Sequence, residues 1–180
     1  MSIRMLALCG SLRRDSWNRK LLLHAQKIGV TLEADIRLAE IGELPHYSQD
    51  LQSQGFPTIV TALGDKIRQA DAVLIASPEY NYSVPGVLKN AIDWLSRLPE
   101  APLAGKPTAL MGASPGLIGT ARMQYHLRQI LLCLDADTVS KPEVMIGQCS
   151  EKFSADGALT DSKAREMVER LLRALIAKAT

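Results

Sequence analysis

Short apolar runs and amphipathic stripes alternate along this chain. Three runs, residues 3–9, 72–77 and 107–113, are nearly all apolar and short enough to be strands buried on both faces. Residues 32–38 alternate between apolar and polar side chains, which predicts a more exposed strand. A weaker strand is expected between Thr138 and Ile146, so the pattern predicts five strands.

Apolar residues recur at helical spacing between these strands. Gly29 marks the end of the first helix, and Pro85 with Gly86 marks the start of another. The predicted helices cover residues 16–28, 58–70, 85–95, 119–134 and a terminal stretch from 164 to 175. Alternating strands and helices imply right-handed crossovers. We therefore expect one domain, residues 1–180, with a flavodoxin-like, doubly wound α/β fold: a five-stranded parallel sheet with helices on both faces.

Composition narrows the class of partner. Hydrophobic residues make up 47% of the 180 residues, charged residues 22%, and the formal net charge is +2. The chain can therefore bury a core, and it lacks the strong positive charge of a nucleic-acid-binding protein. No stretch approaches the ~20 apolar residues of a membrane span, and the N-terminal apolar run is too short for a signal peptide. We expect a cytoplasmic protein that binds neither nucleic acid nor membranes.

The cysteines and histidines give no sign of a metal site. Cys9, Cys133 and Cys149 form no C-x-x-C pair. Cys9 lies in an apolar strand and Cys133 in an apolar helix stripe, so we interpret both as buried free thiols. The histidines have no partners at metal-ligand spacing, and we expect no bound metal.

Polar loops follow the three most apolar strands. Their sequences are G-S-L-R-R-D-S-W-N (10–18), S-P-E-Y-N-Y-S-V-P-G (77–86) and G-A-S-P-G-L-I-G-T (112–120). The carboxyl ends of parallel strands lie at one edge of a doubly wound sheet, where such folds bind ligands. We therefore expect the three loops to converge on one site. The long segment 42–57 is expected to border that site, since long loops are often functional.

The first loop predicts a phosphate site. Ser11, Ser16 and Asn18 supply hydroxyl and amide donors. Arg13 supplies positive charge, and the helix that follows adds unpaired N–H groups and the positive end of its dipole. A capping role for Ser16 or Asp15 would explain only one of these residues. The loop has neither the G-K-[ST] of a Walker A motif nor the G-x-G-x-x-G of a Rossmann turn.

The second and third loops indicate a planar ligand. Tyr80 and Tyr82 are two of only four tyrosines, and flat side chains beside backbone donors suit a heteroaromatic ring with polar edges. A rigid turn shaped by Pro78 and Pro85 is the alternative interpretation. Small residues in the third loop would let a ligand approach the backbone closely, although a simple tight turn explains them equally well.

These motifs carry a family resemblance. The stretches that carry it are G-S-L-R-x-x-S-x-N, P-E-Y-N-Y-S-V-P-G-x-L-K-N-A-I-D-W-L-S-R and the run A-R-M-Q-Y-H-L-R-Q-I-L (121–131). They make the chain similar to the NAD(P)H-dependent FMN reductase family, and especially to its bacterial chromate reductase or quinone reductase branch. The resemblance implies non-covalent FMN, contacted by Ser11, Arg13, Ser16 and Asn18 at its phosphate, by Pro78, Glu79, Tyr80, Asn81, Tyr82 and Ser83 at its isoalloxazine and ribityl groups, and by Ser114 at the ring. The third loop departs from the family, because Ser-Pro-Gly stands where relatives often have a second serine and no proline.

The resemblance also implies a reaction. NAD(P)H would reduce the flavin, which would pass two electrons to a quinone, with chromate, azo or ferric compounds as further acceptors. One shared face of the flavin implies ping-pong kinetics, and no catalytic side chain is expected because the flavin performs the hydride transfer. The family is usually a homodimer or homotetramer.

Two alternatives stay open at this point. One is a flavodoxin-like electron-transfer protein without its own NAD(P)H oxidation. Carriers that dock on basic partners are usually strongly acidic, which a net charge of +2 does not match. The other is a flavin-free regulatory or scaffold protein on the same fold, which the intact polar loops disfavour.

Overall fold

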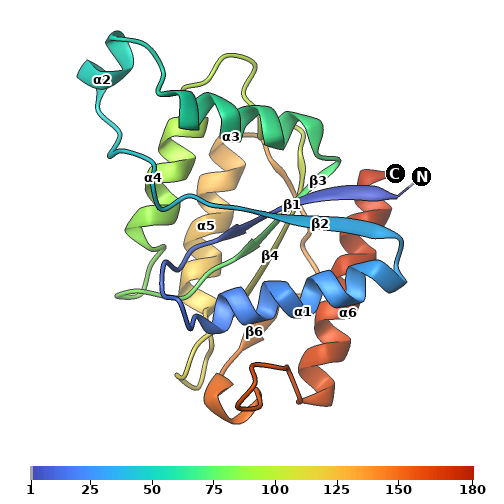
Figure 1. Cartoon of the computed structure of the whole chain (residues 1–180). Helices are drawn as coiled ribbons and strands as arrows, with labels where there is room; N and C mark the ends of the chain where they lie inside the picture. Colours follow the sequence, from blue (N-terminus) through green and yellow to red (C-terminus); the bar gives the residue numbers. More distant parts are fainter. Residues whose placement is uncertain (1) are drawn as a thin grey trace.

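The computed structural model describes residues 2–180 and has a parallel sheet at its centre (Figure 1). The strands are β1 (Ile3–Cys9), β2 (Ala34–Ala39), β3 (Ala72–Ala76), β4 (Pro107–Ala113), β5 (Asp137–Thr138) and β6 (Val144–Ile146). Their order is β2-β1-β3-β4, with β5 and β6 both paired to β4. Every pairing is parallel. The chain runs from β1 to β2 on one side and then crosses to β3 on the other side of β1, so the switch point of the sheet lies between β1 and β3. This is the predicted flavodoxin-like topology.

The fifth position in the sheet is divided between two short strands. β5 pairs with Pro107 and Thr108 at the start of β4, and β6 pairs with Met111–Ala113 at its end. Pro142 lies between β5 and β6, and a proline has no N–H to donate to the ladder. The single weak strand predicted near 138–146 is therefore two short strands that pair with opposite ends of β4.

Helices cover both faces of the sheet, as predicted (Figure 1). One face carries α1 (Trp17–Thr31) and α6 (Ser162–Ala179), and the other carries α3 (Thr58–Gln69), α4 (Gly86–Leu95) and α5 (Ala121–Cys133). The short helix α2 (Gln49–Ser53) and a 3₁₀ helix (Cys149–Glu151) lie in connections.

The core consists of two apolar clusters separated by the sheet. Along β1, Met5 and Ala7 pack in the cluster under α1 and α6, whereas Leu6 and Leu8 pack in the cluster under α3, α4 and α5. This alternation follows from the two-residue period of side chains along a strand. The sheet is thus buried on both sides, which leaves its carboxyl edge as the place for a ligand.

One prediction about the core is wrong. Cys133 was expected to be a buried thiol, but its side chain is exposed. The buried stripe of α5 runs through Met123, Leu127 and Leu131, and a residue two positions after Leu131 lies about 200° around the helix from it. Cys9 and Cys149 are buried and free, as expected for Cys9.

The segment 42–57 is fastened to α4 and is not structureless. The indole Nε1 of Trp94 donates to the Pro45 carbonyl oxygen at 2.8 Å. The amide of Asn90 donates to the same oxygen at 2.9 Å and accepts from the N–H of Tyr47 at 2.8 Å. These bonds satisfy backbone groups that an open loop would leave to water, and they attach the segment to α4.

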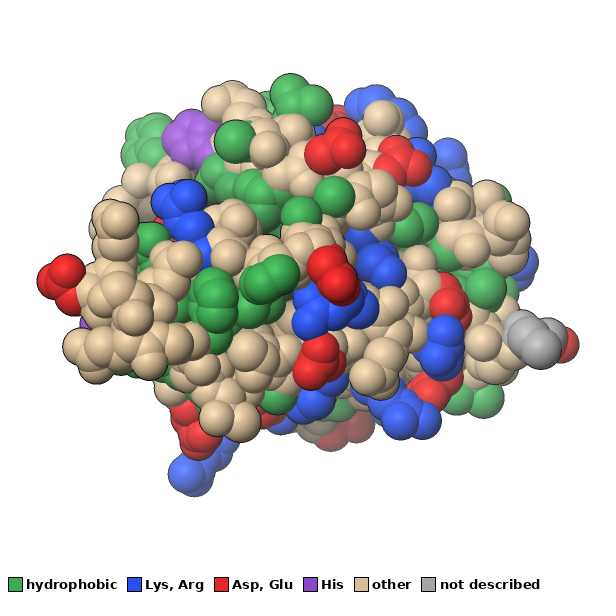
Figure 2. All heavy atoms as spheres, turned by 90° about the horizontal axis from the view of Figure 1, so that it is seen from above, with side chains coloured by type: hydrophobic (Ala, Val, Ile, Leu, Met, Phe, Trp, Pro, Cys, Tyr) green, Lys and Arg blue, Asp and Glu red, His purple; other side chains and the backbone are tan. Residues whose placement is uncertain are grey.

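The face of the molecule seen in Figure 2 carries charges of both signs. Figure 2 shows acidic and basic side chains beside one another, with small apolar areas between them. Within residues 2–180, no helix has both the length and the apolar character that crossing a membrane requires. The same residues include no group of three or more histidine, cysteine, aspartate or glutamate side chains placed to hold a metal ion.

Candidate functional site

The three polar loops converge at the carboxyl edge of β1, β3 and β4, as the topology predicts. They enclose a pocket of about 120 Å³, here called the three-loop pocket. Its lining residues are Ser11, Arg13, Ser16, Trp17, Asn18, Pro78, Glu79, Tyr80, Ala113, Ser114 and Pro115. The segment 42–57, which was expected to border the site, contributes none of them.

The first loop presents unpaired donors at the start of α1. The Ser16 hydroxyl caps the helix by accepting from the N–H of Arg19 at 3.3 Å. Within residues 2–180, neither the N–H of Trp17 nor that of Asn18 has an acceptor. The first turn of α1 contains no acidic residue, and the Asp15 carboxylate just before the N-cap is paired with Lys20, so the positive end of the helix dipole can attract a further anion. An anion such as a phosphate fits this arrangement.

Asn18 has a second role that the sequence did not indicate. Its side chain is 2% exposed, its Nδ2 donates to the Ala113 carbonyl at 3.0 Å, and its Oδ1 accepts from the Ala113 N–H at 2.9 Å. The amide therefore joins the first loop to the end of β4. Both ends of the side chain are used in this pair, while the second hydrogen on Nδ2 and the backbone N–H of Asn18 have no acceptor within residues 2–180.

The charged and sulfur groups of the first loop differ in accessibility. Arg13 is exposed, and its Nη2 donates to the Asp15 carbonyl at 2.6 Å. Cys9 lies below the loop, and its Sγ is 3.5 Å from the Ser11 carbonyl. Burial raises the pKa of the Cys9 thiol, so the group stays neutral and serves as packing.

The second loop is a two-residue turn with an unfavourable sequence. The N–H of Tyr80 donates to Ser83 O at 3.1 Å, and the N–H of Ser83 donates to Tyr80 O at 2.9 Å. The central residues have positive φ, 49° at Asn81 and 69° at Tyr82, which defines a type I′ turn. Such turns favour Asn-Gly, and a left-handed conformation costs a non-glycine residue about 1–2 kcal/mol. The loop is thus a tight turn, and the exposed rings of Tyr80 and Tyr82 leave it compatible with a planar ligand.

Contacts with α5 hold this turn in place. The Glu79 carboxylate accepts from the N–H groups of Arg122 and Met123 at 3.0 and 3.1 Å and from the Arg122 guanidinium at 3.1 Å. The same guanidinium lies 3.8 Å from the centre of the Tyr82 ring. The Ser83 hydroxyl and His126 Nδ1 are 3.0 Å apart. Sequence reasoning assigned no role to Arg122, although it lies in the quoted run 121–131.

Small residues shape the third loop. A methyl group on Gly112 would come within 2.1 Å of the Thr120 hydroxyl oxygen and 2.6 Å of the Ser77 carbonyl oxygen, so only glycine fits between the second and third loops. The Ser114 hydroxyl accepts from the N–H of Gly116 at 3.1 Å, and the Ser114 N–H donates to Ile146 O at 2.9 Å. These bonds make a tight turn that leaves Ser114 on the pocket wall.

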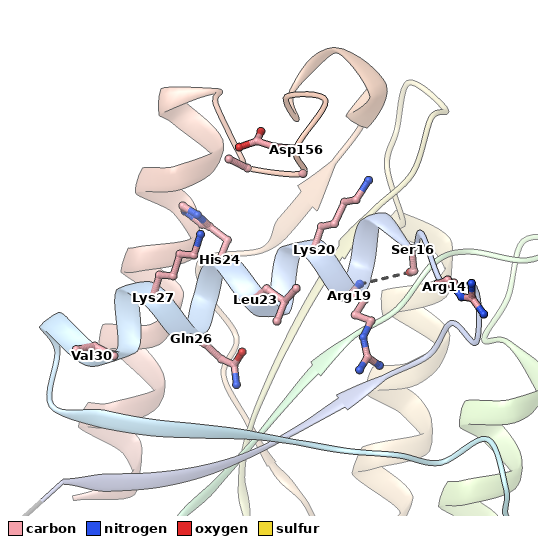
Figure 3. A pocket seen from close by; sticks show the side chains of 12 residues that line it. Arg14, Ser16, Arg19, Lys20, Leu23, His24, Gln26, Lys27, Val30 and Asp156 are labelled. Atoms are coloured by element: carbon pink, nitrogen blue, oxygen red, sulfur yellow. Dashed lines mark hydrogen bonds between the residues drawn. The ribbon is translucent and has the colours of Figure 1, made fainter.

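A larger cavity of about 550 Å³ lies over the outer face of α1 and shares Ser16 with the three-loop pocket (Figure 3). Figure 3 shows Lys20, His24 and Lys27 on the side of α1 that faces Asp156. The positive charge along this cavity is partly neutralised, since Lys20 pairs with Asp15. Burial, and then the charges of Arg165 and Lys27, lower the pKa of His24. The three-loop pocket is nevertheless the candidate site, because it lies at the switch point of the sheet and contains the unpaired donors.

Comparison with known proteins agrees with this geometry. A model of the family "NADPH-dependent FMN reductase" matches residues 3–151. The chain is 51% identical over 174 residues to an NAD(P)H-dependent FMN reductase of Pseudomonas aeruginosa, covering 96% of this chain and 93% of that protein. It is 52% identical over 151 residues to the quinone reductase of Escherichia coli K12, covering 83% and 80%. The structure of the flavoenzyme NAD(P)H:(acceptor) oxidoreductase of Paracoccus denitrificans superimposes with a TM-score of 0.89 at 40% identity, covering 98% and 97%.

The residues present also fit FMN chemically. The unpaired N–H groups at the start of α1 and the Arg13 guanidinium suit a phosphate, and exposed tyrosines beside the small third loop suit a flat ring. The chain therefore belongs to the NADPH-dependent FMN reductase family, with FMN as its cofactor and NAD(P)H as its co-substrate.

Proposed function

We propose that this protein is an FMN-dependent NAD(P)H:quinone oxidoreductase that works by two-electron, ping-pong reduction. The observation that carries the proposal is the convergence of all three polar loops on one pocket at the switch point of the sheet. The names of the relatives support a quinone acceptor, since the Escherichia coli protein at 52% identity is a quinone reductase.

The first loop would hold the FMN phosphate. The backbone N–H groups of Trp17 and Asn18 are free to donate to it. Ser16 Oγ accepts from the Arg19 N–H, so its own proton stays available for a phosphate oxygen. Ser11 would donate in the same way, and Arg13 would add a charge-assisted bond.

The second and third loops would hold the isoalloxazine and ribityl groups. The N–H groups of Asn81 and Tyr82 have no acceptor within residues 2–180, which makes them available to carbonyl and ring nitrogen acceptors. Pro78, Tyr80 and Ser114 line the pocket beside them. The Glu79 carboxylate is directed at α5, so Glu79 would contribute its backbone to this contact.

The bound flavin supplies the hydride and electron transfer chemistry. The chain supplies binding and electrostatics: N–H donors of the second loop would stabilise negative charge that develops on the ring. Tyr82, 64% exposed, would form one side of the face where nicotinamide and acceptor stack in turn. No side chain is required as a general acid or base.

The proposal extends to acceptors, assembly and location. An exposed face of this kind would also admit chromate, azo or ferric compounds as incidental acceptors. Exposed apolar side chains close to the site in sequence, including Leu117, Ile118 and Tyr125, support a homodimer or homotetramer. We place the protein in the cytoplasm as one domain spanning residues 1–180.

An absorption spectrum under anaerobic conditions tests the function. We expect the purified protein to show oxidised flavin absorbance that NADPH or NADH bleaches in one step and that benzoquinone restores. Flavin that binds but stays oxidised with both nucleotides would favour the alternative of an electron-transfer protein. A colourless protein that takes up no added FMN would contradict the proposal entirely.

A further inference from the structure

We propose that Glu79 and Arg122 are positioning residues that hold Tyr82, and with it the 80–83 turn, in the conformation that the flavin site needs. Neither residue needs to touch the reacting atoms. The functional meaning of the inference rests on the proposed placement of FMN beside the second loop. The structural half of the inference, that Glu79 and Arg122 hold the shape of the turn, concerns the apoprotein and does not depend on FMN.

Glu79 acts as the N-terminal cap of α5 from a distant loop. The helix begins after Thr120, whose side chain makes no capping bond. The Glu79 carboxylate instead accepts from two of the first backbone N–H groups of α5, at 3.0 and 3.1 Å. Its side chain is 10% exposed, so these bonds satisfy a nearly buried charge. The second loop is thereby fixed to the start of α5.

Arg122 transmits this attachment to Tyr82. One Nη of its guanidinium is 3.1 Å from the Glu79 carboxylate, and the guanidinium centre lies 3.8 Å from the middle of the Tyr82 ring. The planar guanidinium can make both contacts together, which a lysine ammonium would do less well. Glu79 therefore orients Arg122, and Arg122 orients Tyr82.

The turn needs this support because its sequence is unfavourable for its shape. A type I′ turn favours glycine at the second central position, where this chain has Tyr82 at φ 69°. The local sequence therefore does not select the observed conformation, and contacts with α5 must do so. In that conformation the N–H groups of Asn81 and Tyr82 stay unpaired within residues 2–180 and are presented together to a ligand.

Amide hydrogen exchange on the apoprotein tests the structural half. We expect R122M to lower the protection of the Tyr80 and Ser83 amides about tenfold, because loss of the stacking and ion-pair contacts opens the turn. E79Q keeps the shape of the side chain and should lower protection about threefold. The control R173M removes the arginine of the Glu169–Arg173 pair on α6 and should leave both amides unchanged.

A second set of variants, made in the Y82G background, separates an effect of Arg122 on the turn from an effect on α5. Y82G creates the favoured Asn-Gly sequence, so in the Y82G background R122M should change protection less than about twofold. If R122M lowers protection equally in both backgrounds, Arg122 acts through α5 and not through Tyr82, and the proposal is wrong. If R122M and E79Q both have the melting temperature of the wild type and the same protection of the Tyr80 and Ser83 amides, the turn does not need Glu79 and Arg122. The proposal is then also wrong.

Flavin affinity tests the functional half. Quenching of FMN fluorescence should show a dissociation constant about tenfold higher for R122M and unchanged for R173M, since a disordered turn must be ordered on binding. A turn that loses protection without any loss of FMN affinity would overturn the role in the flavin site. Failure of the wild-type protein to bind FMN would contradict the proposed function and would leave the exchange result intact.

Discussion

In the loop after β1, Ser16 begins a helix of 15 residues, whereas in the loop after β3, residues 80–83 form a turn whose two central residues both have positive φ. The first loop gains its donors from local structure, since any helix leaves its first N–H groups unpaired. The second loop gains its shape from Arg122 and Met123, which bind Glu79 across 43 and 44 residues of sequence. Two loops on one pocket can thus be specified in different ways, one by its own residues and one by a distant helix.

This comparison predicts that changes in the first loop lower both folding stability and ligand affinity, whereas changes in the second loop lower ligand affinity with little change in stability. The first loop is built into the core through Asn18 and the start of α1. The tip of the second loop, residues 80–82, is exposed, and the loop is attached to α5 through Glu79 and Ser83.

The largest effect is expected for N18A. The change leaves the N–H and carbonyl of Ala113 without their partners in a buried place, which should cost about 2–4 kcal/mol of unfolding free energy. Urea unfolding of the apoprotein measures it. Q26A, which removes one half-buried bond to Ile36, should cost only about 1 kcal/mol. Equal losses for the two variants would show that Asn18 does not fasten the loop.

A smaller loss of stability, with a clear loss of binding, is expected for S16A. Removal of the cap should cost about 1 kcal/mol. Loss of the hydroxyl donor should also raise the FMN dissociation constant about tenfold, because a charge-assisted bond to the phosphate is lost. The serine control S53A, on α2 and away from the pocket, should leave FMN affinity unchanged. Unchanged affinity in S16A would place the phosphate elsewhere.

In the second loop, H126A should weaken FMN binding with almost no loss of stability. The Ser83–His126 contact is exposed, so its loss should change the unfolding free energy by no more than about 0.5 kcal/mol. FMN affinity should fall about threefold, because one attachment of the turn to α5 is gone. Thermal melting and fluorescence titration together measure the two quantities. A destabilisation as large as that of S16A would remove the contrast between the loops.

The smallest effect is a pH dependence in the first loop. Lys20, which pairs with the exposed Asp15, holds the pKa of that carboxyl below its ordinary value of 3.8. A carboxyl with a lowered folded-state pKa stabilises the fold above its unfolded pKa, and this contribution is lost as the pH falls through the folded pKa. D15N should therefore be slightly less stable than the wild type at pH 6. The difference should shrink below pH 4 and also at high salt, as unfolding curves at each pH would show. A difference that persists at pH 2 would need a cause other than the ion pair.

Sequence patterns predicted the framework and not every contact. The three most apolar strands and the five long helices were placed correctly, because side-chain periods of two and 3.6 residues are local properties. The wrong expectation for Cys133 arose because an apolar stripe near the end of a helix does not say which of its last residues still faces the core. The division of the fifth strand reflects Pro142 within the segment together with the parts of β4 that accept a partner, and this second factor lies outside the segment.

By itself, the sequence determined that three polar loops would meet at one edge of a parallel sheet and that the first would offer an anion the start of a helix. The cause in each case lies within a few consecutive residues: strand periodicity, a capping serine and unpaired N–H groups. Only the tertiary structure decided that the Glu79 carboxylate caps α5, that the Asn18 amide joins two loops, and that Tyr82 holds a left-handed conformation. These features depend on partners 40 to 95 residues away, which lie close only in the assembled fold.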